Sequence, residues 1–144
     1  MVKKYNYGIV MKFYRMERWC YLHKLKVFAK IINRYIYLQF NCSIPFTTKI
    51  GPNVEIVHGI GIVLHQYSTI GEGTKIYQNV TLGNAMGPKI GKNCIIGSGA
   101  VVLGDIVIGD NVRIGANAVV LQDVPDNCTA VGVPAKIIYR QEGK

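Results

Sequence analysis

The chain of 144 residues lacks any uncharged apolar run of the length that a membrane-spanning helix needs, about 20 residues. Its basic start, Met1-Val2-Lys3-Lys4, is not followed by an apolar block with a small-residue cleavage site, which a secretory signal would require. Because both features are missing, we predict a cytoplasmic protein.

The cysteines lack the close pairing that zinc sites and disulfide frameworks show. Cys20, Cys42, Cys94 and Cys128 lie far apart in the chain, with no pair two residues apart. We therefore expect four reduced side chains that pack as small hydrophobes, and we expect no bound metal.

Acidic residues are scarce at one end of the chain. Residues 1–42 carry nine Lys or Arg against the single acidic residue Glu17, a net charge of +8. The rest of the chain carries eight basic and seven acidic residues, a net charge of +1. The sequence thus divides into two regions of different chemistry.

What the sequence does have is a repeat of six residues. Branched apolar residues recur at this interval, apart from two steps of eight, Ile62 to Ile70 and Leu82 to Ile90. The repeated residues are Ile50, Ile56, Ile62, Ile70, Ile76, Leu82, Ile90, Ile96, Val102, Ile108, Ile114 and Val120. Six is an even number, so this repeat suits the alternation of a strand and not the period of a helix.

The fourth residue of each unit indicates a corner. Ten of the twelve are Gly, Asn or Asp, the residues that best tolerate positive φ. Three short strands with corners between them close a triangular coil, and stacked coils bury a continuous aliphatic core. We predict an all-β fold, a left-handed parallel β-helix of hexapeptide repeats over residues 43–138. A basic amphipathic helical segment over residues 1–42 precedes it and a tail, 139–144, follows it.

The two eight-residue steps predict loops, because the extra residues must leave the coil, and loops on a rigid scaffold often carry sites. In the irregular units, the fourth and fifth residues are His65-Gln66 and Ala85-Met86. We expect His65 to turn a corner at positive φ; the alternative is a role in an active site.

Five motifs follow one another along the β-helix region: IVHGIGIV (56–63), QNVTLG (78–83), PKIG (88–91), IGSGA (96–100) and VGVPAK (131–136). In this order they resemble the serine acetyltransferase branch of the hexapeptide acyltransferases. That branch also includes O-acetyltransferases of capsular and exopolysaccharide synthesis. The likeness extends over about residues 43–138.

The resemblance implies a homotrimer that binds acetyl-CoA in the groove between neighbouring subunits, with His58 as the catalytic residue. It further implies that Gly83 and Asn84 edge the pantetheine tunnel. Ser98 and Ala116 would contact CoA through backbone amides, and Lys136 would lie near its phosphates. The alternative is that small residues at these positions serve the coil alone and that Lys136 is a solvated charge.

Chemistry supports a base at position 58 independently of the resemblance. A hydroxyl is a poor nucleophile, and a neutral imidazole can take its proton while the oxygen attacks a thioester. Direct transfer then depends on proximity, on this base and on donors for the developing oxyanion. No covalent intermediate is required.

The sequence departs from serine acetyltransferases where those enzymes hold serine. Ser43 stands where they have an aspartate that pairs with the histidine, Val57 where another aspartate precedes it, and Met86-Gly87 where they have Arg-His. Their helical N-terminal domain is also much longer. Since the groups that would hold an ammonium and a carboxylate are missing, we predict a neutral acceptor, a sugar hydroxyl in surface-polysaccharide biosynthesis.

The alternatives are a serine O-acetyltransferase and a non-catalytic β-helix scaffold. Ser43 or a backbone carbonyl is expected to orient His58, and Met86 to lie near the acceptor.

Residues 9–40 alternate apolar and basic side chains at spacings of three and four, which predicts one or two amphipathic helices, interrupted near Asn33. One interpretation is a cap over the first coil, because an open β-helix end exposes unpaired edges. A second, compatible interpretation is contact with an anionic membrane surface, at the inner face of the membrane. No nucleic-acid recognition module is present, so we expect no nucleic-acid partner.

Overall fold

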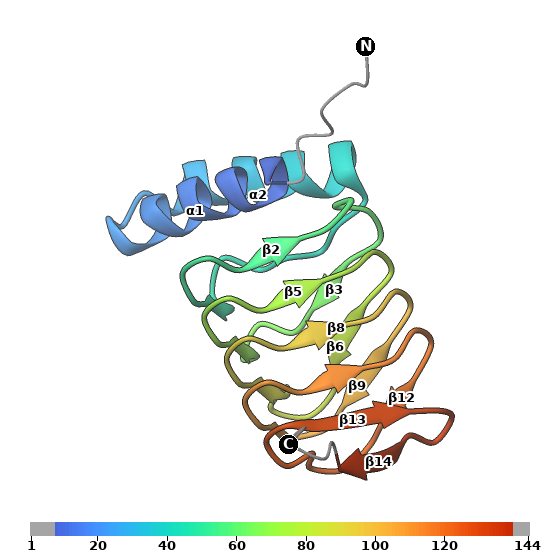
Figure 1. The fold of residues 1–144 in the computed structure, drawn as a ribbon. Coiled ribbons are helices and arrows are strands. Elements are labelled where there is room, and N and C mark those ends of the chain that lie inside the picture. Colours follow the sequence, from blue (N-terminus) through green and yellow to red (C-terminus); the bar gives the residue numbers. More distant parts are fainter. Residues whose placement is uncertain (1–7, 140–144) are drawn as a thin grey trace.

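In the computed structural model, which describes residues 8–139, a stack of coils is closed at one end by two helices (Figure 1). Helix α1 spans Ile9–Leu22 and helix α2 spans Lys26–Phe40. The chain turns between them at Lys24, which has a φ of 63°. Two helices were within the prediction, but the expected interruption near Asn33 is wrong, because Asn33 lies inside α2.

The strands form three sheets, one along each side of the coil, which we name by their first strands. The β1 side consists of β1 (Lys49–Ile50), β4 (Thr69–Ile70), β7 (Lys89–Ile90) and β10 (Val107–Ile108). The β2 side consists of β2 (Glu55–Ile56), β5 (Lys75–Ile76), β8 (Ile95–Ile96), β11 (Arg113–Ile114), β13 (Cys128–Val131) and β14 (Lys136–Tyr139). The β3 side consists of β3 (Val63–Leu64), β6 (Thr81–Gly83), β9 (Val101–Leu103) and β12 (Val119–Val120).

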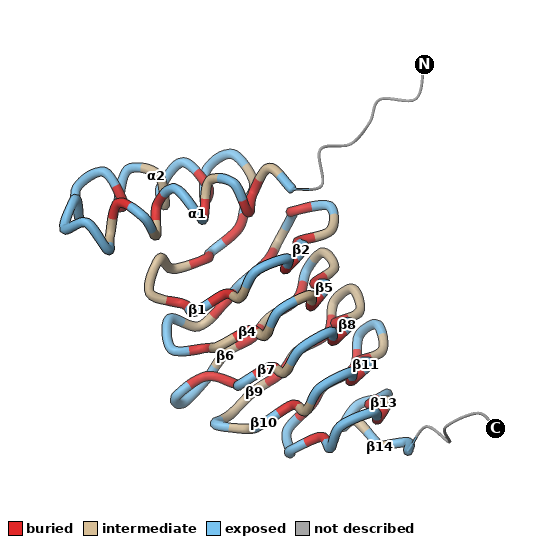
Figure 2. Tube along the Cα trace, turned by 60° about the vertical axis from the view of Figure 1, so that its left-hand side comes forward, coloured by how far each residue is buried: buried red, intermediate tan, exposed pale blue. Residues whose placement is uncertain are grey.

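All paired strands run parallel except β14, which is antiparallel to β13. In each coil the second residue of the strand points inward and is buried, while the first is exposed or half-buried. Figure 2 shows this alternation from coil to coil. Burying one branched side chain contributes roughly 1.5–3 kcal/mol, so the column of inward Ile, Val and Leu holds the stack together. The predicted fold class is confirmed.

Two of the three corners use the residues that the repeat predicts. Of the twelve fourth-position residues, nine have positive φ, among them Asn93 at 52°, Asn117 at 56° and Gly99 at 69°. His65, Asp105 and Asp123 do not have positive φ, so the positive φ predicted for His65 is wrong. His65 does begin a turn at the corner, where its carbonyl accepts a hydrogen bond from Ser68 N at 3.0 Å. All three follow the β3 side, whose corner to the β1 side is built differently.

The first eight-residue step lies elsewhere than the repeat predicts. Leu64, not Ile62, pairs with Leu82 on the β3 side, so the irregular step runs from Ile56 to Leu64. The sequence suggests the wrong register because both Ile62 and Leu64 are apolar. Ile62 is fully buried as well, but it is the residue that follows the corner and does not lie in the strand. The second irregular step, Leu82 to Ile90, is where it was predicted.

The helices close the end of the coil by meeting its free carbonyl groups. Arg18 Nη1 donates to Phe46 O at 2.7 Å, Tyr14 Oη donates to Thr48 O at 2.5 Å, and Asn33 Nδ2 donates to Ile44 O at 2.8 Å. Arg15 donates to Ile50 O at 2.9 Å. These oxygens lie in the first coil, which has no coil above it, so the cap prediction is confirmed by contact. Neither helix of residues 8–139 has the length and hydropathy that crossing a membrane requires.

Candidate active site

His58 and Gly59 are themselves the two extra residues of the first irregular step. Val57 N donates to Ile76 O at 2.7 Å, as a coil residue does, and the next coil bond is Asn79 N to Ile60 O at 3.0 Å. The two residues between these anchors bulge out at the corner between the β2 and β3 sides. Their φ angles are 67° and 57°.

The backbone explains why a small residue follows the histidine. A Cβ on Gly59 would lie 2.7 Å from Val10 Cγ2 of α1, so the cap packs directly on the bulge. The His58 side chain is exposed, while Gly59 is buried. The insertion and the helix thus fix the backbone that presents His58 to solvent.

Below the bulge, the same corner holds two of the predicted CoA contacts. Gly99 N donates to Gln78 O at 2.9 Å and Asn117 N donates to Ser98 O at 2.8 Å, so successive coils stack at this corner. Ser98 and Ala116 therefore lie in one column beneath His58. At about 4.8 Å per coil, the column from the His58 bulge to the last coil is about 19 Å long.

Lys136 lies at the lower end of this column. Ala135 N donates to Val119 O at 2.8 Å, which places the segment before Lys136 against the last strand of the β3 side. A cavity of about 350 Å³ opens there. It is lined by Leu121, Gln122, Val133, Pro134, Ala135 and Lys136. Apolar walls with one exposed ammonium suit a ligand that has both an apolar and an anionic part.

The remaining predicted residues gather at the opposite edge of the β3 side. Asn84 begins the loop of the second irregular step, and its Oδ1 accepts a hydrogen bond from Ala85 N at 2.7 Å. The loop closes with Gly87 N donating to Asn84 O at 2.8 Å. Gly83 is the last residue of β6, directly before this loop, and Met86 is exposed within it.

His65 supports this loop from the coil above. A Cβ on Gly87 would lie 2.9 Å from His65 Nδ1, so the loop rests on the imidazole. The same nitrogen accepts a hydrogen bond from Tyr67 N at 3.3 Å, and the His65 and Tyr67 rings meet edge-on at 5.5 Å. His65 is half-buried beside this loop. An active-site role for it stays a prediction.

The predicted residues are thus brought together in two groups and not in one. Asn79 at one edge of the β3 side and Asn84 at the other are five residues apart, which at 3.3 Å per residue is about 16 Å. His58, Ser98, Ala116 and Lys136 belong to the first edge. Gly83, Asn84, His65 and Met86 belong to the second.

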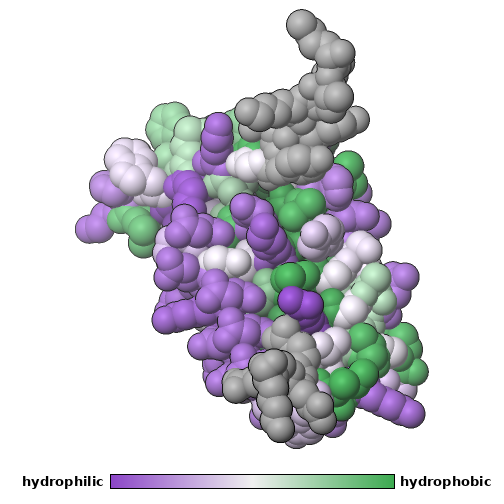
Figure 3. All heavy atoms as spheres, in the orientation of Figure 1, coloured by the Kyte–Doolittle hydropathy of each residue, from purple (hydrophilic) through white to green (hydrophobic). Residues whose placement is uncertain are grey.

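Between the two edges, the outer face of the β3 side is uncharged. Its outward residues are Val63, Thr81, Val101 and Val119, whereas the β1 and β2 sides present Lys49, Lys89, Glu55, Lys75 and Arg113. Ion pairs join Lys75 to Glu55 at 3.3 Å and Lys89 to Asp105 at 3.5 Å on those charged sides. In Figure 3 hydrophobic side chains gather over the region of β9 and β12, and the opposite flank is hydrophilic.

Ser43 begins the β3 side. Its amide donates to Ile62 O at 2.7 Å and its carbonyl accepts from Leu64 N at 2.8 Å, so its backbone is fixed in the sheet. Its side chain is exposed and Val57 is half-buried. That Ser43 orients His58 stays a prediction.

The cysteines offer no alternative nucleophile among residues 8–139. All four are free and buried, as predicted. Burial raises the pKa of the Cys42 and Cys94 thiols, which disfavours the reactive thiolate. Within the same residues, no cluster of three or more His, Cys, Asp or Glu side chains could hold a metal ion.

Sequence reasoning missed two features of the site. It did not identify His58-Gly59 as the insertion. Taking Gly61 as the corner residue and Leu64 as the inward residue would have given the correct register, and Gly61 does have a positive φ, of 68°. It also did not identify the cavity wall of Leu121, Gln122 and Val133, because β12 and the segment before β14 meet only in the folded chain.

Residues 87–122 match the family "Bacterial transferase hexapeptide (six repeats)". A serine acetyltransferase of Synechococcus elongatus is 39% identical over 133 residues, which are 88% of this chain and 54% of that protein.

Solved structures agree. A serine acetyltransferase in complex with CoA has a TM-score of 0.84 at 36% identity, covering 90% of this chain and 55% of that one. The Neisseria gonorrhoeae serine acetyltransferase in complex with serine has a TM-score of 0.84 at 34% identity, covering 88% and 54%. The repeat of residues 87–122 is therefore similar to that of the bacterial hexapeptide transferases, as the motifs predict. The chain spans a little over half the length of these relatives.

Proposed function

We propose that the protein is an O-acetyltransferase that takes its acetyl group from acetyl-CoA and uses His58 as the general base. The observation that carries this proposal is the position of His58, on a two-residue insertion at the upper end of the column formed by Ser98, Ala116 and the Lys136 cavity. The likeness to serine acetyltransferases, one of them in complex with CoA, supports it.

The chemistry follows from the residues of that column. The imidazole of His58 takes the proton of the acceptor hydroxyl while the oxygen attacks the thioester carbonyl. The tetrahedral intermediate collapses, the C–S bond breaks, and the CoA thiolate takes the proton back from the imidazolium. The donor lies along the column, with Lys136 near its phosphates and backbone amides of Ser98 and Ala116 beside its extended arm.

A homotrimer with the donor between subunits accounts for the division of the predicted residues. The two edges of one β3 side lie about 16 Å apart, and we infer that a second copy brings its own edge against the His58 column. The uncharged outer face between them supports contact between copies. Replacing Val101 with Glu should lower the molar mass measured by sedimentation. Ile95→Glu, an outward position on the β2 side, is the matched control and should not.

Serine is the first candidate acceptor, because the relatives are serine acetyltransferases and one structure is a complex with serine. The comparisons do not support the predicted closeness to polysaccharide O-acetyltransferases. A neutral sugar hydroxyl is retained as the second candidate for one reason: Ser43, Val57 and Met86-Gly87 supply no charge for an amino acid. A non-catalytic scaffold is the third.

The test is CoA release from acetyl-CoA with L-serine and with a panel of neutral sugars. Activity with serine alone supports the first candidate, and activity with sugars alone supports the second.

Asn tolerates the positive φ of position 58, so His58→Asn removes the base without straining the bulge. We expect a loss of roughly 10²–10⁴-fold in kcat. His23→Asn, an exposed histidine after α1, is the control and should retain activity. Full activity of His58→Asn would overturn the assignment of the base, and no CoA binding by calorimetry would favour the scaffold.

A further inference from the structure

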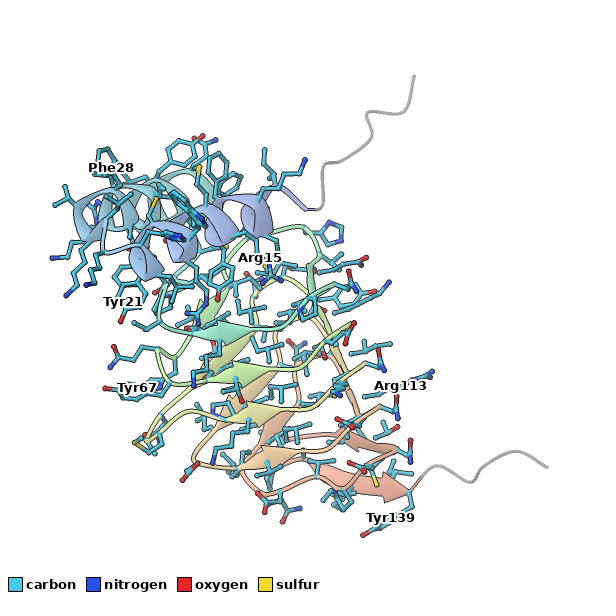
Figure 4. The ribbon with its side chains drawn as sticks, turned by 90° about the vertical axis from the view of Figure 1, so that its left-hand side faces the viewer. Arg15, Tyr21, Phe28, Tyr67, Arg113 and Tyr139 are labelled. Atoms are coloured by element: carbon cyan, nitrogen blue, oxygen red, sulfur yellow. The ribbon has the colours of Figure 1, made fainter. Side chains whose placement is uncertain are left out.

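The helical cap has an outer face that no part of residues 8–139 covers. On α2, the buried residues Ala29 and Ile36 lie on one side, and the stripe of Val27, Ile31 and Leu38 lies on the opposite side. Ile31 is 59% exposed and Leu38 is 68% exposed. In Figure 4 Phe28 points away from the β-helix, while Arg15 and Tyr21 lie toward it.

Helix α1 continues this face. Met16 and Trp19 lie opposite the buried residues Val10, Tyr14 and Glu17, and Trp19 is 54% exposed. The two helices pack side by side across the end of the coil, so their outer stripes form one surface at that end of the molecule (Figure 1). Contiguous apolar patches of this kind are uncommon on soluble proteins unless they bind something.

The charge of the same surface is of one sign. Exposed basic side chains lie among the apolar ones: Lys12 on α1, Lys24 in the turn, and Lys26, Lys30 and Arg34 on α2. Arg15 and Arg18 are not available to it, because they bind carbonyl groups of the first coil. The only acidic residue of the two helices, Glu17, is buried.

We propose that this outer face of the cap docks on the surface of an anionic phospholipid bilayer. Apolar side chains enter the boundary between headgroups and acyl chains, and the surrounding Lys and Arg bind the lipid phosphates. Charge complementarity decides against a second copy of the chain, which would set five basic residues against the same five. The uncharged β3 side is the face suited to that contact. Lys3, Lys4, Tyr5 and Tyr7, which also belong to the basic segment 1–42, lie outside the described residues.

Binding is measured with the full-length protein, without acetyl-CoA, so that the result does not depend on the proposed activity. The probes are vesicles of phosphatidylcholine alone and vesicles of equal parts phosphatidylcholine and phosphatidylglycerol. We expect sedimentation with the anionic vesicles at low salt, little with the neutral ones, and release by high salt. Trp19 is the only tryptophan and lies in the face, so its emission should shift to the blue and be quenched by brominated lipid.

Three double variants separate the contributions. Each lysine near an anionic surface contributes about fivefold in partitioning, so Lys26→Gln with Lys30→Gln should weaken binding by about 25-fold. Ile31→Ser with Leu38→Ser should weaken it by about tenfold and should abolish the Trp19 shift. Lys89→Gln with Lys92→Gln, the same charge change on the exposed β-helix, is the control and should bind like the parent. Circular dichroism checks that all three remain folded.

Several outcomes would overturn the proposal. They are no binding to anionic vesicles at low salt, equal binding to neutral vesicles, and equal loss in the Lys89 and Lys92 control. The protein could also bind no vesicles while the double variant Ile31→Ser with Leu38→Ser halves the molar mass of the particle. That result would assign the face to contact between copies instead. Vesicle binding by a protein without acetyltransfer would leave this proposal standing and would remove only the proposed function.

Discussion

Two insertions of two residues interrupt successive coils, at opposite edges of the β3 side, and the chain treats them differently. His58-Gly59 is a tight bulge with positive φ at both residues, closed by Val10 of α1. The second, in the loop 84–87, is an exposed turn that rests on His65 and Ser68. The first insertion presents a single side chain from a fixed backbone. The second presents a short stretch of main chain at the other edge.

The sharpest way to separate the two insertions is to delete each of them. Removal of His58 and Gly59 restores the six-residue step from Ile56 to Leu64, so the coil should still form while CoA release falls roughly 10²–10⁴-fold. Removal of Ala85 and Met86 restores the second step and should mainly raise KM. The measurement is steady-state CoA release, with circular dichroism for folding. Equal loss of kcat in both deletions would contradict the difference between them.

The helix that closes the first insertion also carries a buried carboxyl group. Burial raises the pKa of Glu17 from its ordinary value of 4.5 to about 8, and the Asn33 side chain offsets this only in part. Because the folded state favours the protonated form, the contribution of Glu17 to stability is fully present below about pH 4.5 and is lost as pH rises through about 8.

Glu17→Gln should therefore be nearly neutral below pH 4.5 and stabilise the protein increasingly up to about pH 8, by a few kcal/mol. Thermal melts of both proteins across this range measure the effect. Gln66→Glu, an exposed position on the β-helix, is a control that should leave the pH dependence unchanged. A difference between Glu17→Gln and the wild type that is independent of pH would contradict a buried, protonated Glu17.

Glycine substitutions compare how the two insertions are held. Gly59→Ala places a Cβ 2.7 Å from Val10 Cγ2 at a φ of 57°, and Gly87→Ala places one 2.7 Å from Ser68 Oγ at a φ of 73°. Each should destabilise the protein by roughly 1–3 kcal/mol. Only Gly59→Ala should increase amide hydrogen exchange in α1, because only that insertion packs under the helix. Unchanged exchange in α1 would show that the cap does not depend on the bulge.

The smallest effect is expected at the far end of the His58 column. Lys136→Gln removes one exposed charge from the cavity wall, so KM for acetyl-CoA should rise about fivefold while kcat is unchanged. Lys92→Gln, at a corner of the coil remote from this column, is the matched control. A lower kcat with an unchanged KM would place Lys136 outside the donor site.

The sequence predicts the coil well because its determinants are local. An inward branched residue and an αL-tolerant corner recur within six residues, so strand, corner and core follow from neighbours along the chain. The prediction is wrong where two local solutions compete. Ile62 and Leu64 are both buried, and only the pairing of Leu64 with Leu82 selects the register that makes His58-Gly59 the insertion.

The sequence by itself thus determined the repeat, the helical character of the first 40 residues, and His58 as the residue to consider first. Only the tertiary structure decided which residues were inserted, that Val10 closes over the bulge, and that the predicted CoA contacts fall on two edges. The physical reason is that a period specifies which side of a coil a residue occupies. Stacking, by contrast, specifies which residues of different coils meet, through hydrogen bonds between segments 18 or 20 residues apart.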